Sequence, residues 1–200
     1  MIIIGITGTL GAGKGTVVEF LEKEKGFQHY SVRGYLVEEI KKKGMVVNRD
    51  SMTSIANDLR AQHSPSYIID ELYIMAKASS KNCVIESIRT PGEIESLRKK
   101  DRFYLFAVNA SPDLRFQRIK SRASVTDNVD FDTFLANEKR EMNTDDPNKQ
   151  NLGKCISMAD YIFENNGSVE ELVNKVSKVV EKIKGPDDTG NLMKRYCLKT

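Results

Sequence analysis

The chain has 200 residues, of which 40% are hydrophobic and 30% are charged. This is enough for one domain with a substantial core and scarcely enough for two. The net charge of +3, with both signs interspersed, favours neither a nucleic-acid nor a membrane partner. No run approaches the ~20 apolar residues of a membrane helix. Cys83, Cys155 and Cys197 are too widely spaced to indicate a zinc site or a disulfide framework, which favours a cytoplasmic location.

The first predicted element is a buried strand over residues 1–7, which contains four isoleucines. No basic residues precede it, so it is interpreted as part of the fold rather than as a signal peptide. A helix is predicted further on, because Val17, Phe20 and Leu21 recur at helical spacing until Gly26 ends the pattern. Between strand and helix lies the run Gly8-Thr9-Leu10-Gly11-Ala12-Gly13-Lys14-Gly15-Thr16.

This run is interpreted as a phosphate-binding loop. Glycines let main-chain N–H groups converge on an anion, and the following helix directs the positive end of its dipole to the same point. Lys14 is expected to reach the outer phosphates of a nucleoside triphosphate, and Thr16 to approach the metal or an inner phosphate, although the usual pattern places a hydroxyl where this chain has Gly15. The predicted nucleotide-binding residues of the loop are Gly8, Gly11, Ala12, Gly13, Lys14, Gly15 and Thr16.

Strands and helices alternate along the rest of the chain. Strands are predicted at 27–31, 82–87, 103–109 and 161–164. Capping signals predict helix starts after Ser64, Thr90, Ser111 and Ser168. The first of these helices is expected to present Ile68, Leu72, Met75 and Ser79 on one face, and the last to bury Val169, Leu172, Val173, Val176, Val180 and Ile183. The alternation predicts an α/β fold of three layers, a parallel sheet with helices on both faces.

Nucleotide sites in such sheets lie beyond the carboxyl ends of the strands. Ser31 and Arg33 follow the second predicted strand, and Arg49 and Arg60 follow in the next helical region. These residues are predicted to line a cleft for an anionic second substrate. The alternative for each arginine is an ordinary solvated surface position.

The third predicted strand ends at Glu86, with Arg89 three residues beyond it. Enzymes with a phosphate-binding loop place an acid here that orders Mg²⁺, often through water, so Glu86 is predicted to lie on the metal side. Arg89 is predicted to contact a phosphate chain. The alternative is a salt bridge between Glu86 and an arginine.

The helix after Ser111 carries Arg115, Arg118 and Arg122 on one face. Like charges at this spacing repel unless an anion offsets them, and a triphosphate undergoing transfer is such an anion. The alternative partners are carboxylates such as Glu138 or Glu141. The polar stretch 123–130 that follows is a candidate lid.

The loop ending Gly13-Lys14-Gly15-Thr16 resembles that of adenylate kinase and related P-loop nucleoside monophosphate kinases. The arginine helix, the Ala159-Asp160-Tyr161-Ile162 strand and the Asn165-Asn166-Gly167 loop also resemble dephospho-coenzyme A kinases and phage deoxynucleoside monophosphate kinases. The resemblance implies a five-stranded parallel sheet, Mg²⁺-ATP as donor, an acceptor-binding segment near 31–80, a lid, and Asn166 near the adenine. It covers one domain, residues 1–184, and leaves 185–200 as a tail.

The function predicted is ATP-dependent phosphoryl transfer to a nucleoside or deoxynucleoside monophosphate, by a monomer or a homodimer. Dephospho-coenzyme A kinases place an aspartate after the second strand to take a proton from a hydroxyl acceptor, where this chain has Ser31-Val32-Arg33. A monophosphate needs cations and no such base, which favours the phosphate acceptor. Two alternatives stay open: transfer to a hydroxyl, and a non-catalytic nucleotide-binding module that regulates a partner.

Overall fold

The computed structural model describes residues 1–100, 102–122 and 129–185. Their strands agree with the predicted ones to within one residue at each end. In chain order the elements are β1 (Ile2–Gly8), α1 (Lys14–Lys23), β2 (Gln28–Ser31), α2 (Val32–Lys42), α3 (Arg49–Gln62), α4 (Tyr67–Ser79), β3 (Cys83–Glu86), α5 (Pro91–Arg98), β4 (Arg102–Asn109), α6 (Pro112–Arg122), α7 (Phe131–Met142), α8 (Leu152–Ser157), β5 (Tyr161–Glu164) and α9 (Val169–Lys184).

The five strands form one parallel sheet in the order β2-β3-β1-β4-β5. β1 lies at the centre and every one of its residues is buried, which explains its continuous apolar sequence. The chain passes from β1 to one side of the sheet and later crosses to the other. The resulting switch point lies at the carboxyl end of β1, which is where open α/β sheets bind ligands.

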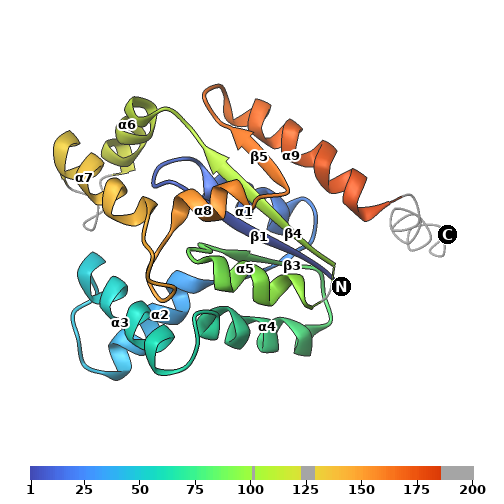
Figure 1. Ribbon diagram of the computed structural model, residues 1–200. Helices are drawn as coiled ribbons and strands as arrows, with labels where there is room; N and C mark the ends of the chain where they lie inside the picture. The colour runs from blue at the N-terminus through green and yellow to red at the C-terminus, as the bar shows by residue number, and fades with distance from the viewer. Residues whose placement is uncertain (101, 123–128, 186–200) are drawn as a thin grey trace.

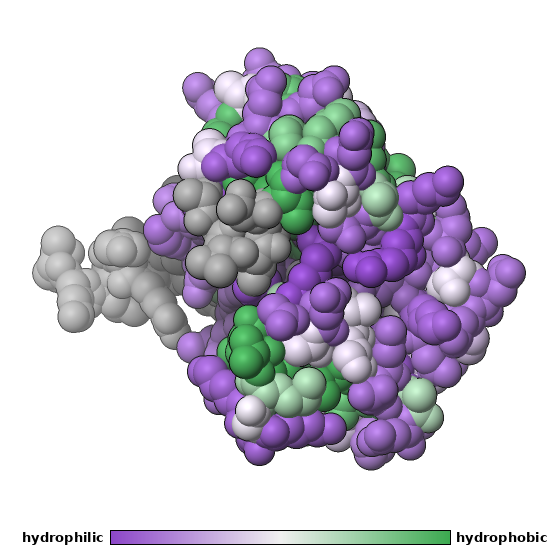
Figure 2. Space-filling view, turned by 90° about the vertical axis from the view of Figure 1, so that its left-hand side faces the viewer, coloured by the Kyte–Doolittle hydropathy of each residue, from purple (hydrophilic) through white to green (hydrophobic). Residues whose placement is uncertain are grey.

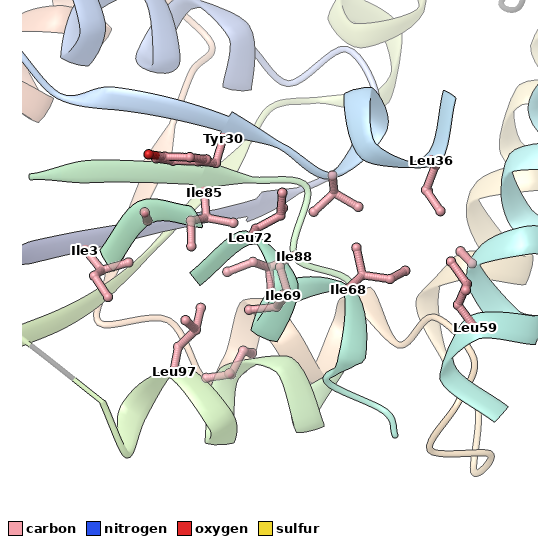
Figure 3. Close-up of a cluster of buried hydrophobic side chains, with 14 of the residues drawn as sticks. Ile3, Tyr30, Leu36, Leu59, Ile68, Ile69, Leu72, Ile85, Ile88 and Leu97 are labelled. Atoms are coloured by element: carbon pink, nitrogen blue, oxygen red, sulfur yellow. The ribbon is translucent and has the colours of Figure 1, made fainter. Parts of the chain in front are cut away.

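Helices cover both faces of the sheet, as predicted (Figure 1). One face packs against α1 and α9, through residues such as Val17, Leu21 and Val176. The other packs against α4, α5 and α8 and continues into α2 and α3. Figure 3 shows this second core, in which Ile68, Ile69 and Leu72 of α4 meet Ile3, Ile85 and Leu97.

Two of the predicted helix starts, at Thr90 and Ser168, are confirmed by cap geometry, whereas the helix expected after Ser64 begins at Tyr67 without a side-chain cap. Thr90 accepts from the main-chain N–H of Glu93, whose side chain returns to the Thr90 N–H in a capping box. Ser168 accepts from the N–H of Glu171 at the start of α9. None of the described helices has the length and apolarity needed to span a bilayer.

One predicted buried position is wrong, because Val169 of α9 is 63% exposed. Met75 of α4, predicted on the same face as Ile68 and Leu72, is 55% exposed. In α4 the buried stripe is rotated towards Ile69 and Ala76, and Val169 lies in the first turn of α9, ahead of the buried positions that begin at Leu172. The candidate lid 123–130 and the tail 185–200 lie largely outside the described residues, which include only Val129, Asp130 and Gly185 of them.

Candidate functional site

The loop between β1 and α1 takes a curled conformation that only glycine permits at three positions. Gly8, Gly11 and Gly13 have φ angles of 131°, 79° and 105°. A Cβ atom would lie 2.0 Å from the Val108 carbonyl oxygen at Gly8 and 2.3 Å from Nδ2 of Asn165 at Gly13. The backbone therefore packs closely on its surroundings at these positions.

Lys14 folds back across this loop. Its Nζ donates to the carbonyl oxygens of Gly8 and Thr9, at 2.8 Å each. Burial, together with the positive charge of Arg89, lowers the pKa of Lys14 from 10.5 to about 7, although the carboxylates of Glu86 and Glu141 act in the opposite direction. A bound anion would restore the charged form.

The depressed pKa of Lys14 predicts a pH-dependent stability. Between pH 7 and about 10 the unfolded chain holds a proton on this group that the folded protein has lost, so the contribution of Lys14 to the free energy of unfolding rises with pH. Over pH 7 to 9.5, the Tm of the nucleotide-free protein is expected to rise relative to that of a Lys14→Met variant. Equal dependence on pH in the two proteins would contradict the assignment.

A cleft of about 460 Å³ opens beside the loop, at the carboxyl end of the sheet. Figure 2 views this end and shows strongly hydrophilic side chains gathered in the hollow between its upper and lower parts. Six cationic side chains and two carboxylates line the cleft, a formal excess of four positive charges that favours an anionic ligand. The lining residues are Leu10, Gly11, Gly13, Lys14, Gly15, Val32, Arg33, Leu36, Arg49, Met52, Thr53, Ala56, Arg60, Glu86, Ser87, Arg89, Arg122, Glu141 and Gln150.

Ten of the predicted site residues therefore meet in one cavity. Those predicted residues that do not line it are Gly8, Ala12, Thr16, Ser31, Asn166, Arg115 and Arg118. Of these, Ser31 caps α2 and donates to Oε1 of Glu86 at 3.0 Å. Asn166 accepts from the main-chain N–H of Ser111 at 2.8 Å and lines a separate cavity of about 470 Å³.

Glu141 of α7 joins two of the cleft arginines. Its Oε1 accepts from Arg49, at the start of α3, and its Oε2 accepts from Nη1 of Arg89 at 2.9 Å. Burial alone raises the pKa of Glu141, but the charges of Arg89 and Arg49 lower it below its ordinary value, so the carboxylate is ionised. Both guanidinium groups are thereby fixed at the cleft wall.

Arg60 lies deeper, with only 2% of its surface exposed. Its Nε and Nη2 donate to Oε1 of Glu93, at 3.2 and 2.8 Å. The other oxygen of Glu93 accepts from the main-chain N–H groups of Arg89 and Thr90. The solvated position considered for Arg60 is therefore wrong: it is a buried side chain, held in place by a residue of the α5 capping box.

Glu86 stands at the end of β3, facing the loop. Burial alone raises its pKa, but contact with His29, a hydrogen bond from Ser31 and the charge of Lys14 lower it below the ordinary value. An ionised carboxylate therefore faces the cleft beside the phosphate-binding loop. The alternative of a salt bridge between Glu86 and an arginine is absent among the described residues, where its ion-pair partner is His29.

The three arginines of α6, grouped in the sequence analysis, have different surroundings. Arg115 is buried and directs its guanidinium to Glu138, the alternative partner considered above, and to the Ala110 carbonyl oxygen. Nη2 of Arg118 donates to the Asn165 carbonyl oxygen at 3.0 Å. Of the three, Arg122 alone lines the main cleft, and Arg115 pairs with a carboxylate that the sequence analysis gave as the alternative partner.

Several lining residues were missed in the sequence. Glu141 and Gln150 come from α7 and the segment after it, and nothing in their local pattern distinguishes them from surface residues. The apolar wall formed by Val32, Leu36 and Met52 carries a helical signal that indicates burial but not a ligand. These residues become visible as site residues only once α2, α3 and α7 are placed around the loop.

The AAA domain family matches residues 4–144. A UPF0200 protein of Methanococcus maripaludis is 31% identical over 186 residues, which cover 92% of this chain and 98% of the relative. The chain is a UPF0200 protein with an AAA domain. Its P-loop is thus that of a nucleotide-binding family.

Solved structures of low identity share the fold of this UPF0200 protein. A gluconokinase from Sinorhizobium meliloti superposes with a TM-score of 0.55 at 12% identity, covering 90% of this chain and 94% of that one. The dephospho-CoA kinase from Campylobacter jejuni gives 0.50 at 15% identity, covering 92% and 98%. The chain therefore has the P-loop kinase fold that the sequence predicted.

Proposed function

We propose that this protein transfers the γ-phosphoryl group of ATP to the phosphate of a nucleoside or deoxynucleoside monophosphate. The observation that carries the proposal is the single cleft in which Lys14 of the P-loop meets Arg33, Arg49 and Arg89. Its volume of about 460 Å³ lies within the range of small-molecule sites. Segment 31–80 forms the acceptor side, and residues 123–130 are proposed as the lid.

In the proposed reaction, an oxygen of the acceptor monophosphate attacks the γ-phosphorus of ATP. The bond from that phosphorus to the β,γ-bridging oxygen breaks, and ADP leaves with the electron pair. The main-chain amides of the loop and the Lys14 ammonium hold the β- and γ-phosphates, while Arg122 offsets the charge of the transferring group. Arg33, Arg49 and Arg89 hold the acceptor phosphate in line.

The residues present fit a Mg²⁺ ion bound mainly by phosphates and water. The described residues contain no group of three or more His, Cys, Asp or Glu side chains that would hold a metal unaided. Mg²⁺ in such enzymes takes only one or two protein oxygens, which the ionised Glu86 and the hydroxyl of Thr16, in the first turn of α1, would supply. When bound, it neutralises charge on the phosphates.

A phosphate acceptor is favoured over a hydroxyl because the residues after β2 supply a cation and no base. A hydroxyl must lose its proton during attack, whereas a monophosphate is already an oxyanion. Ser31 is the last residue of β2, and Arg33 faces the cleft. Glu86, the carboxylate nearest this strand end, is held by Ser31 and lies on the proposed metal side.

A coupled ADP-release assay across ribo- and deoxynucleoside monophosphates, with dephospho-coenzyme A included, tests the proposal. At least one monophosphate is expected to be converted to the diphosphate, which phosphorus NMR of the product identifies. Turnover of dephospho-coenzyme A alone would assign the hydroxyl acceptor instead. ATP binding without transfer to any acceptor would leave a regulatory nucleotide-binding module.

A further inference from the structure

One residue of the cleft wall has a backbone conformation that its side chain disfavours. Ser87 follows β3, lines the cleft and has a φ angle of 69°. Among the described residues other than glycine, only Ser80, at the end of α4, shares a positive φ. A side chain is disfavoured in this left-handed region, whereas glycine enters it freely. The backbone alone would therefore favour glycine at both positions.

The residues on either side of Ser87 hold it in this conformation. Glu86 lies in register with Ile6 of β1. Ile88 donates its N–H to the Ile6 carbonyl oxygen at 3.0 Å, and its own carbonyl oxygen accepts from Oγ1 of Thr7 at 2.8 Å. The Ile88 side chain is fully buried. Because both neighbours are fixed to β1, Ser87 cannot relax its backbone without disturbing the end of the sheet.

The hydroxyl of Ser87 is available to a ligand. It makes no hydrogen bond with any described residue, and it is not among the polar atoms that are sealed from solvent without a partner, so solvent reaches it. The other hydroxyl in the cleft lining, that of Thr53, donates to the Arg49 carbonyl oxygen at 3.0 Å. Within the described lining, Ser87 thus supplies the hydroxyl that the protein itself does not use.

We propose that Ser87 donates a hydrogen bond to the phosphate of the acceptor nucleotide and helps to orient it for attack. The proposal rests on the proposed function, since it adds a contact to the acceptor side of the same cleft. In the sequence, Ser87 stands between Glu86, on the proposed metal side, and Arg89, which Glu141 holds at the cleft wall.

The chemistry of the cleft suits a neutral donor at this position. The lining already carries an excess of positive charge, so a further cation would add repulsion, whereas a hydroxyl adds a directed hydrogen bond to a phosphate oxygen. A disfavoured backbone conformation persists where its surroundings impose it, and such residues cluster at functional sites. The bound phosphate would give this serine a role that glycine cannot fill.

Two variants remove the hydroxyl with opposite effects on the backbone. Ser87→Ala keeps the disfavoured conformation and Ser87→Gly relieves it, so the glycine variant is expected to melt about 2–4 °C above the alanine variant. Both are expected to lower kcat/KM for the monophosphate by about tenfold or more, the effect of one hydrogen bond to a charged group. KM for ATP is expected to stay unchanged.

Ser80 provides the matched control. It shares the positive φ but precedes β3, at the opposite end of that strand from the cleft. Ser80→Gly is expected to melt above Ser80→Ala, and both variants are expected to keep the transfer kinetics and the monophosphate affinity of the unaltered protein. The comparison separates the loss of the hydroxyl from the change in stability.

The outcomes separate the two proposals. Unchanged acceptor kinetics in Ser87→Ala and Ser87→Gly overturn the role of Ser87 and leave the kinase assignment standing. A loss in only one of the two also overturns it, because the backbone would then be the cause. If no monophosphate is turned over, the transfer reaction is refuted and calorimetric titration of the monophosphates decides the role of Ser87. Weaker binding by both variants would support the contact, whereas equal binding, or none by the unaltered protein, would overturn it.

Discussion

Replacing Lys14 by methionine is expected to lower kcat/KM for phosphoryl transfer by about 10²–10³-fold. Lys14 is the basic residue of the loop itself, and its Nζ already lies across the loop at the Gly8 and Thr9 carbonyl oxygens. Methionine keeps the length of the side chain and loses the charge. Steady-state kinetics with the best monophosphate acceptor, and calorimetric titration of ATP, measure the loss.

The matched control is Lys23→Met, at the far end of the same helix, where the side chain is exposed and paired with Glu19. It is expected to leave both kinetics and ATP affinity unchanged. At pH 8 the Lys14 variant is expected to melt no earlier than the unaltered protein. With a pKa of about 7, the Lys14 side chain is largely uncharged at that pH, so methionine removes little favourable charge. Unimpaired transfer by Lys14→Met would refute the assigned role.

Replacing Glu93 by alanine is expected to destabilise the protein by about 3–5 kcal/mol. The carboxylate is fully buried, and its loss leaves the Arg60 guanidinium without its counter-charge and the Arg89 and Thr90 amides without an acceptor. For a domain of this size the change corresponds to a fall in Tm of roughly 10 °C, measured by calorimetry or circular dichroism.

Glu95→Ala is the control for this variant, since Glu95 lies on the exposed side of the same helix. Its expected change in Tm is within about 2 °C, typical of surface substitutions. A Glu93 variant that melts together with this control would show that the buried ion pair contributes nothing to stability. Because the helix cap and the pair share one carboxylate, Glu93→Gln is expected to restore part of the loss.

The fold was predictable because its signals are local. The isoleucines of β1, the glycines of the loop and the Thr90 cap each act within a few residues of their position. Gly8 is also required because a side chain there would collide with the Val108 backbone. The glycine that marks the loop in the sequence therefore also indicates its close packing. Met75 is exposed because the buried stripe of α4 also runs through Ile69 and Ala76, on the side of the helix away from Met75.

The candidate site was predictable only in its outline. The strand-end rule located Arg33, Glu86 and Arg89 in the cleft. It could not reveal that Arg49 would pair with Glu141, because 92 positions separate these residues and the contact exists only once α7 packs across the cleft. The pair of Arg115 and Glu138 also depends on how the helices pack. Repulsion between like charges on one helix shows that the arginines need a negative partner, but it does not show whether that partner is a carboxylate or a bound anion.

The two ion pairs at opposite ends of α3 differ in their exposure to solvent. The inner one, Arg60 with Glu93, is sealed from water, whereas Arg49 at the outer one is 24% exposed and bridges to the part of the chain beyond α6. Dissolved salt screens the outer pair far more than the inner one. Raising the salt concentration is therefore expected to weaken the contact between α3 and α7 through the outer pair, while the inner pair keeps its strength.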